Sequence, residues 1–123
     1  MQENEPQNVA FYWSTIFVRS LFDEGVQHVV ISPGSRSTSL TLAFSAHAGF
    51  TKHVCIDERS AAFMALGMAK ATGKPAALVC TSGTALANYF PAVIEATQSE
   101  IPLIIAKCGS STPLPGIGRF PNH

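Results

Sequence analysis

A unit made of a short apolar strand, a turn and a helix repeats along this sequence, and no other feature restricts its fold as strongly. The apolar runs are residues 28–32, 53–56 and 76–80, and a fourth run, 101–106, follows the last helix. Strands without polar alternation are buried on both faces, and strands that alternate with helices of about 10 to 15 residues form parallel sheets through right-handed crossovers. The sequence therefore predicts an α/β fold, a parallel sheet with helices on both faces.

Helical patterns precede the first strand and follow each of the next three turns. Apolar residues at helical spacing fill residues 8–22, and Gly25 supplies a stop. The other helices are expected at 40–44, 61–71 and 85–96. The last two are rich in small residues and low in charge, which suits either the core of the domain or an interface between subunits.

The charge balance favours a small molecule or another protein as the partner. Of 123 residues, eight are Lys or Arg and eight are Asp or Glu, and no run of like charge occurs. A binder of nucleic acid or of a membrane surface would carry a basic patch. With 46% hydrophobic residues, the chain has enough apolar side chains for one small packed domain.

The sequence also predicts a cytoplasmic protein with reduced thiols and no metal site. Residues 1–10 are polar and acidic, and no apolar stretch approaches the roughly 20 residues of a membrane span. Cys55, Cys80 and Cys108 are widely spaced, form no CxxC pair and are not grouped with His as zinc ligands would be.

Three loops are expected to meet at one edge of the sheet. In a parallel sheet, every strand-to-helix loop lies at the carboxyl ends of the strands, where ligands bind. These loops are 33–38 (PGSRST), 57–60 (DERS) and 81–84 (TSGT). The first offers hydroxyls, backbone amides and a guanidinium to a carboxylate or phosphate, and the third offers a glycine for close approach of a ligand. In both, the Ser and Thr residues would serve equally well as helix caps.

Glu58 is the candidate proton-transfer group. It follows an apolar strand at the ligand-binding edge and precedes the nearly nonpolar segment 61–66. A carboxyl group in such surroundings would have a raised pKa and could hold or share a proton. The alternative is that Asp57 and Glu58 only occupy the first turn of a helix, where acidic side chains interact favourably with the helix dipole.

Taken together, these segments resemble one family of thiamine-diphosphate enzymes. ISPGSRST, DERSAAFMALGMAKATGKPAALVCTSGTALANYFPAVIEA and IPLII are similar to the start of the 2-succinyl-5-enolpyruvyl-6-hydroxy-3-cyclohexene-1-carboxylate synthases of menaquinone biosynthesis, and the resemblance runs from Asn8 to Ile105. Other thiamine-diphosphate enzymes share the glutamate and a glycine-rich turn, whereas SPGSRST points to this family. The resemblance implies the pyrimidine-binding N-terminal domain of such an enzyme, in truncated form.

The resemblance implies roles for residues in all three loops. Glu58 would hydrogen-bond N1′ of the cofactor's aminopyrimidine and so promote removal of the proton from the thiazolium ring. Ser35 and Arg36 would face the substrate carboxylates. The cofactor-binding residues would be Glu58, Thr81, Ser82 and Gly83, and Asn88 matches a family position to which no role is assigned.

The resemblance also implies a reaction and an assembly. Members use thiamine diphosphate and Mg²⁺ to decarboxylate 2-oxoglutarate and to add the product to isochorismate. Their homo-oligomers form each active site between subunits, from a pyrimidine domain and a diphosphate domain. The Gly-Asp-Gly motif and downstream Asn that hold Mg²⁺ do not occur in these 123 residues. The chain alone is therefore expected to be inactive and to self-associate through uncovered apolar surface.

Residues 108–123 depart from the family pattern, which sets the expected domain at residues 1–107 and makes 108–123 an unstructured tail. The family continues with Ala-Asp-Arg-Pro-Pro, and this chain does not. Back-translation with one nucleotide removed at Cys108 restores that segment when codons are chosen within the degeneracy of the code. The resulting hypothesis is a reading-frame shift just before Cys108, which the nucleotide sequence of codons 105–123 tests.

Two other functions fit parts of the pattern. Another thiamine-diphosphate carboligase or decarboxylase would share the fold and Glu58. A non-catalytic α/β remnant would instead bind a protein partner through its Ala-rich helices. Turnover that depends on Glu58 would separate the enzymes from the remnant.

Overall fold

The computed structural model describes residues 5–108, so the expected tail lies outside the described residues except for Cys108. In chain order the elements are α1 (Glu5–Asp23), β1 (His28–Ile31), η2 (Ser35–Ser37), α2 (Thr38–Ala46), β2 (Thr51–Val54), α3 (Glu58–Thr72), β3 (Ala76–Cys80), η3 (Gly83–Ala85), η4 (Ala87–Tyr89), α4 (Phe90–Gln98) and β4 (Leu103–Lys107). The three η elements are single 3₁₀ turns.

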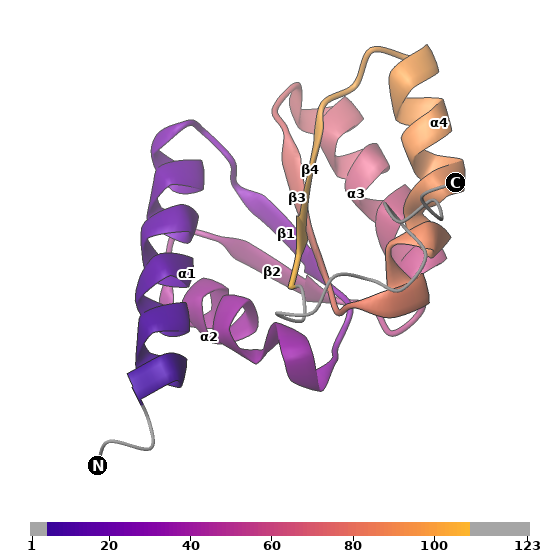
Figure 1. The fold of residues 1–123 in the computed structure, drawn as a ribbon. Coiled ribbons are helices and arrows are strands. Elements are labelled where there is room, and N and C mark those ends of the chain that lie inside the picture. The colour runs from indigo at the N-terminus through magenta and orange to yellow at the C-terminus, as the bar shows by residue number, and fades with distance from the viewer. Residues whose placement is uncertain (1–4, 109–123) are drawn as a thin grey trace, which may run out of the picture.

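Four parallel strands form one sheet in the order β2-β1-β3-β4. Helices α1 and α2 cover one face, and α3 and α4 cover the other, so that the sheet lies between two helical layers (Figure 1). The predicted α/β fold with helices on both faces is confirmed. Because all four strands are parallel, their carboxyl ends lie at one edge.

Side chains of the central strands alternate between two cores. Val29 and Ile31 pack with Phe44 on the side of α1 and α2, whereas Val30 packs with the small residues of α3. All five residues of β3 are buried. Burial on both faces, predicted for every strand, is therefore correct for β3 and wrong for β2, where three of the four residues are exposed because β2 is an edge strand.

The second strand also lies earlier than its apolar pattern indicates. The prediction is 53–56, whereas β2 spans Thr51–Val54. Its pairing with β1 begins at Thr51 and Lys52, two polar residues that give no apolar signal. An edge strand tolerates such residues because one of its faces and one of its sides meet solvent.

Helix α3 begins at Glu58 and not at the predicted position 61. Asp57 is its N-cap, and the Asp57 carboxylate accepts hydrogen bonds from Arg59 N at 3.3 Å and from Ser60 Oγ at 2.8 Å. The helix ends at Gly73, whose φ of 70° is a left-handed conformation that glycine adopts without a Cβ clash. Small buried residues let α3 approach the sheet closely: Ala61, Ala62, Ala65 and Ala69.

The helix predicted at 85–96 is divided in the structure. The 3₁₀ turns η3 and η4 come first, and α4 follows with Pro91 in its first turn. Proline lacks an N–H and fits a helix only near its start, which places the beginning of α4 at Phe90. The two turns bury Ala85 and Tyr89 beneath the carboxyl edge of the sheet.

Helix α1 leaves much apolar surface uncovered. Val18 is buried against the sheet, whereas Tyr12 and Trp13 are 63% and 64% exposed. Even so, no helix within residues 5–108 is both long and apolar enough to cross a bilayer.

The three cysteines are free thiols, as predicted. Cys80 is buried at the end of β3, and Cys55 and Cys108 are half-buried. Burial raises the pKa of the Cys80 thiol and also the pKa of the Cys108 thiol. Both therefore carry little thiolate near neutral pH and are poor nucleophiles.

Candidate active site at the carboxyl edge

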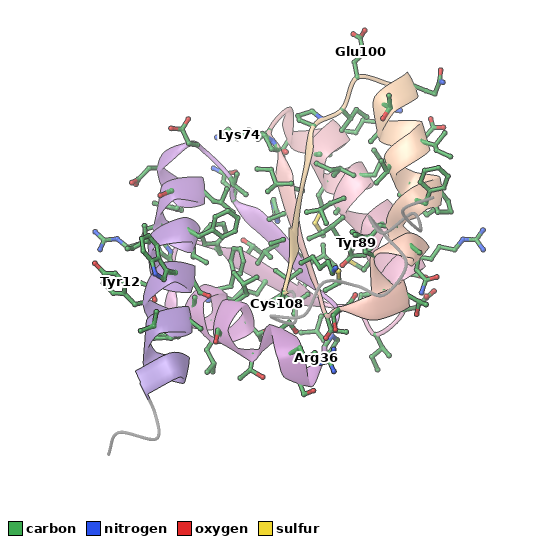
Figure 2. The ribbon with its side chains drawn as sticks, viewed as in Figure 1. Tyr12, Arg36, Lys74, Tyr89, Glu100 and Cys108 are labelled. Atoms are coloured by element: carbon green, nitrogen blue, oxygen red, sulfur yellow. The ribbon has the colours of Figure 1, made fainter. Side chains whose placement is uncertain are left out.

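The three predicted loops follow strand ends that lie side by side in the sheet. Ile31, the last residue of β1, is paired with Val54 of β2 and with Val79 of β3. Figure 2 shows Arg36 and Cys108 at this carboxyl edge, with Lys74 and Glu100 at the opposite edge. The strands thus deliver their loops to one place, as the parallel topology predicts.

Arg36 and Ser82 connect the first loop to the third. Nη1 of Arg36 donates a 2.8 Å hydrogen bond to Ser82 Oγ. A guanidinium has five N–H donors, and this bond uses one of them. Because Arg36 is exposed, its other donors remain available to a carboxylate or phosphate.

The first and third loops also pack tightly at Gly34. A Cβ at position 34 would lie 2.5 Å from Thr81 Cβ, far inside contact distance. The φ of Gly34 is −174°, which any residue can adopt, so the position requires space and not backbone freedom. The absence of a side chain at Gly34 lets the two loops approach, and it thereby allows Arg36 to reach Ser82.

A buried hydroxyl joins the first loop to the second. Ser32 directly follows β1 and is 1% exposed. Its Oγ donates a 2.9 Å hydrogen bond to the Cys55 carbonyl, and its backbone N–H donates to the Val79 carbonyl at 2.9 Å. One residue therefore ties together the ends of three strands. Ser32 is not among the predicted site residues, although a polar residue that closes an apolar run is a visible sign of such a role.

The loop hydroxyls do not cap the helices that follow them. Ser37 and Ser82 occupy the N-cap positions of α2 and η3, and neither makes a side-chain cap hydrogen bond. Ser37 Oγ instead donates to the Gly34 carbonyl at 2.8 Å, and Ser82 Oγ accepts from Arg36. The capping alternative is therefore wrong for these two residues.

Asp57 and Glu58 are adjacent acids with different surroundings. The Asp57 carboxylate accepts the hydrogen bonds from Arg59 N and Ser60 Oγ. These bonds, above all the one from the Ser60 hydroxyl, lower the pKa of the Asp57 carboxyl group. Glu58 is the first residue of α3, as the helix-start alternative expects, and it is half-buried. Desolvation is the largest cause that raises the pKa values of Cys80 and Tyr89, and the charge of Glu58 adds to both shifts. Glu58 begins α3 at the same edge of the parallel sheet at which Cys80 ends β3.

Tyr89 brings a buried phenol hydroxyl to the same region. The residue is 0% exposed, and its Oη has no hydrogen-bond partner among the described residues. The Cys80 thiol and the Ser32 hydroxyl lie nearby without hydrogen-bonding geometry. Desolvation raises the pKa of Tyr89 far above its usual value, so the phenol stays neutral and keeps a donor for a bound group or water. Tyr89 is a second residue that sequence reasoning missed, because it lies inside a predicted helix.

The remaining predicted residues surround the same edge. Ser35 is exposed in η2, and its carbonyl accepts a 2.6 Å hydrogen bond from Thr38 Oγ1. Gly83 has a φ of 84°, a conformation that side chains rarely adopt. Asn88 is exposed in η4. The geometry gives Gly83 a clear backbone role in the turn, and the roles of Ser35 and Asn88 stay predictions.

The edge offers acidic, hydroxyl and guanidinium groups but no metal cage within the described residues. No three His, Cys, Asp or Glu side chains gather there as metal ligands would. Mg²⁺ needs several oxygen ligands, commonly from carboxylates, waters and phosphates. The described residues of this edge thus offer hydrogen-bonding groups and one guanidinium that can bind an anion.

Sequence comparison identifies one family over most of the chain. Residues 13–120 match the family described as thiamine pyrophosphate enzyme, N-terminal TPP binding domain. The 2-succinyl-5-enolpyruvyl-6-hydroxy-3-cyclohexene-1-carboxylate synthase of Geobacillus thermodenitrificans is 55% identical over 98 residues, and that of Haloarcula marismortui is 56% identical over 98 residues. Each alignment covers 80% of this chain and 17% of the relative. The chain thus spans about a sixth of the length of these synthases.

Solved structures show the same fold. A benzoylformate decarboxylase from Polynucleobacter necessarius superposes with a TM-score of 0.71 at 24% identity, over 82% of this chain and 20% of that one. A structure titled a putative thiamin diphosphate-dependent enzyme from Mycobacterium smegmatis superposes with a TM-score of 0.70 at 27% identity, over 87% and 20%. The identity is about half that found with the synthases, so these structures inform on the fold.

Proposed function

Because the chain belongs to the family of thiamine pyrophosphate enzyme N-terminal TPP binding domains, we propose that it is the pyrimidine-binding portion of a 2-succinyl-5-enolpyruvyl-6-hydroxy-3-cyclohexene-1-carboxylate synthase. It is homologous to such synthases at 55% identity over 80% of its length. The proposed reaction decarboxylates 2-oxoglutarate and adds the succinyl-semialdehyde carbanion equivalent to isochorismate, in the cytoplasm, as a step of menaquinone biosynthesis.

The position of Glu58 is the observation that carries this proposal. Glu58 is half-buried, begins α3 directly after its N-cap Asp57 at the carboxyl edge, and its charge adds to the raised pKa values of Cys80 and Tyr89. A carboxyl group can hold a proton at a ring nitrogen of a ligand, and a guanidinium at the same edge of the sheet can bind an anionic substrate. Proton transfer and carboxylate binding are the two tasks that the proposed reaction sets for this domain.

The residues present fit the aminopyrimidine half of thiamine diphosphate. Glu58 would hold N1′ of the pyrimidine, and Thr81, Ser82 and Gly83 would line the ring, where the φ of 84° at Gly83 exposes backbone. The unpaired Tyr89 hydroxyl shows that the region has a polar group to spare. When bound, thiamine diphosphate supplies the carbon nucleophile and the electron sink of the reaction.

The side chains of this chain would divide the remaining work. Glu58 would hold and move the proton at N1′. Arg36, oriented by Ser82, would bind a substrate carboxylate together with Ser35. Asp57 would keep Glu58 in place by fixing the first turn of α3. Mg²⁺ and the diphosphate would be held by another part of the enzyme, because the described residues provide no cluster of metal ligands.

A complementation assay tests the proposal. The 123-residue chain is mixed with the part of the Geobacillus thermodenitrificans synthase that lies beyond its matching segment, and with thiamine diphosphate, Mg²⁺, 2-oxoglutarate and isochorismate. We expect consumption of isochorismate by the mixture and none by either component alone. Glu58→Gln should lower the rate by about 100-fold or more, since removal of a proton-transfer group typically costs that much.

The matched control is Glu24→Gln, the same chemical change at an exposed residue that follows α1. It should leave the rate unchanged. Equal rates for Glu58→Gln and the unaltered chain would refute the assigned role of Glu58. Turnover of benzoylformate or pyruvate, but not of 2-oxoglutarate, would establish another thiamine-diphosphate enzyme, and no turnover with any substrate would support a non-catalytic module.

A further inference from the structure

Two histidines meet across neighbouring strands on the α3 face of the sheet. His28 is the first residue of β1 and His53 is the third residue of β2, and both are half-buried. Their side chains share one face because His53 is paired with Val30, which lies two residues after His28 and packs with the alanines of α3. The sequence predicts no metal site, and the strand register brings together two histidines that lie 25 positions apart.

The two imidazole rings face each other through one nitrogen each. His28 Nδ1 lies 3.3 Å from His53 Nε2, and the ring planes, whose centroids are 5.5 Å apart, are inclined by 29°. In a neutral pair at this separation, one ring donates its N–H and the other accepts with its lone pair. A single proton therefore lies between two nitrogens, each of which is a metal ligand when it is deprotonated.

The separation of these nitrogens matches that of two ligands on one tetrahedral ion. Zn²⁺ binds imidazole nitrogen at about 2.0 to 2.1 Å in a tetrahedral arrangement, so two bound nitrogens stand about 3.3 to 3.4 Å apart. His28 Nδ1 and His53 Nε2 already have this spacing at 3.3 Å. At similar bond lengths, two neighbouring nitrogens on a square-planar Cu²⁺ would stand about 2.9 Å apart, and the rings would have to approach. The pair is thus spaced for Zn²⁺.

The sheet holds both histidines in place before an ion binds. β1 is paired on both sides, with β2 and with β3, and three of its four residues are buried. Its pairing with β2 includes all four residues of β2, from Thr51 to Val54. Because backbone pairing fixes the two Cα atoms, binding of an ion restricts only the side-chain torsions of two rings.

We propose that His28 and His53 form a two-histidine site for a divalent transition metal ion, Zn²⁺ in particular. The ion binds His28 Nδ1 and His53 Nε2, and each ring then carries its N–H on its other nitrogen, so the neutral pair keeps both of its protons. Among residues 5–108, no third His, Cys, Asp or Glu completes a cluster with the pair, so water or a small anion fills the remaining positions. Binding joins β1 to β2 and stabilises the folded chain.

Calorimetric titration of Zn²⁺ into the full 123-residue chain tests this site. We expect one ion per chain, no binding of Mg²⁺, which prefers oxygen ligands, and at least tenfold weaker Zn²⁺ binding in His28→Gln and in His53→Gln, because each variant keeps one imidazole. The matched control is His123→Gln, the same change at the last residue of the chain, and it should bind Zn²⁺ as the unaltered chain does. Circular dichroism verifies that the variants are folded.

Nitrogen-15 NMR of the unaltered chain locates the ion without any substitution. Zn²⁺ should shift the Nδ1 resonance of His28 and the Nε2 resonance of His53, and it should leave His47 unchanged, since His47 Nδ1 accepts a 3.1 Å hydrogen bond from Gly49 N. Absence of binding at millimolar Zn²⁺ would overturn the proposal. Zn²⁺ that binds without shifting these two nitrogens would overturn it as well and would assign the ion to other groups, such as the thiols.

Discussion

The Arg36 guanidinium lies 2.8 Å from the Ser82 hydroxyl, although 46 positions of the sequence separate the two residues. The bond joins the turn after β1 to the turn after β3, at the same edge of the sheet at which Glu58 begins α3. This hydrogen bond orients the Arg36 guanidinium, and it contributes little to the free energy of unfolding because it is exposed to solvent.

Ser82→Ala should change activity more than stability. Loss of the hydroxyl should alter the free energy of unfolding by less than about 0.5 kcal/mol, since both side chains are accessible to solvent. In the complementation assay it should raise KM for 2-oxoglutarate, because Arg36 loses its anchor. Ser45→Ala, at an exposed serine of α2, is the control. An unchanged KM would show that Arg36 needs no orientation by Ser82.

Gly34→Ala should destabilise the chain, and Gly67→Ala should not. The added Cβ at position 34 meets Thr81 Cβ at 2.5 Å, and such overpacking costs about 1 to 3 kcal/mol. At Gly67, in α3, a Cβ finds nothing within 4 Å, so better helix propensity should stabilise by about 0.5 to 1 kcal/mol. Urea unfolding of both variants measures the difference, and similar midpoints would contradict the packing found between the loops.

Asp57→Ala should lower the melting temperature, and this effect should depend on pH. The Ser60 hydrogen bond lowers the pKa of Asp57 in the folded chain, so the contribution of this residue is present above its usual value of 3.8 and is lost as pH falls below it. Asp57→Asn keeps a capping side chain without the titration. The melting temperatures of Asp57→Ala and of the unaltered chain should therefore differ at neutral pH and converge at acid pH. A difference that stays constant with pH would contradict a stabilising role of the ionised Asp57 cap.

Tyr89→Phe should be tolerated at neutral pH and should protect the chain at alkaline pH. The phenol has no partner, so its removal should change stability by no more than about 1 kcal/mol. Burial raises the pKa of folded Tyr89 above the unfolded value of 10.0, so stability is full below that pH and falls as pH rises above it. The difference between the urea midpoints at pH about 8 and about 11 measures this loss of stability, and the difference should be smaller for Tyr89→Phe than for the unaltered chain. Tyr12→Phe, at an exposed tyrosine of α1, should show the same difference as the unaltered chain.

Much of the fold could be predicted because its strongest signals are local. The bounds of β3 are predicted to the residue, since Pro75 and the polar turn enclose five consecutive apolar residues. β2 is misplaced by two residues because an edge strand has no need for that pattern. The start of α4 depends on Pro91, whose effect on the helix is a matter of backbone chemistry that the apolar spacing does not reveal.

The site likewise has features that the sequence predicts and features that it does not. The meeting of the three loops follows from parallel topology, and the Arg36 and Ser82 contact confirms it for two of them. The fit of Gly34 against Thr81 and the bridge from Ser32 to Cys55 depend on distances between strands, which sequence spacing does not encode. The burial of Tyr89 likewise depends on how η4 packs beside α3.

The level ends of β1, β2 and β3 have a consequence for how such proteins diversify. The strands and their alanine-lined helix form a common base, and the loops begin just beyond the last paired residues of these strands. Exposed loop residues such as Ser35 can therefore change the chemistry of the edge, whereas Gly34, which packs against Thr81, is tied to the fold. The benzoylformate decarboxylase is 24% identical to this chain and shares its fold, which is expected if the sheet is kept while most surface residues change.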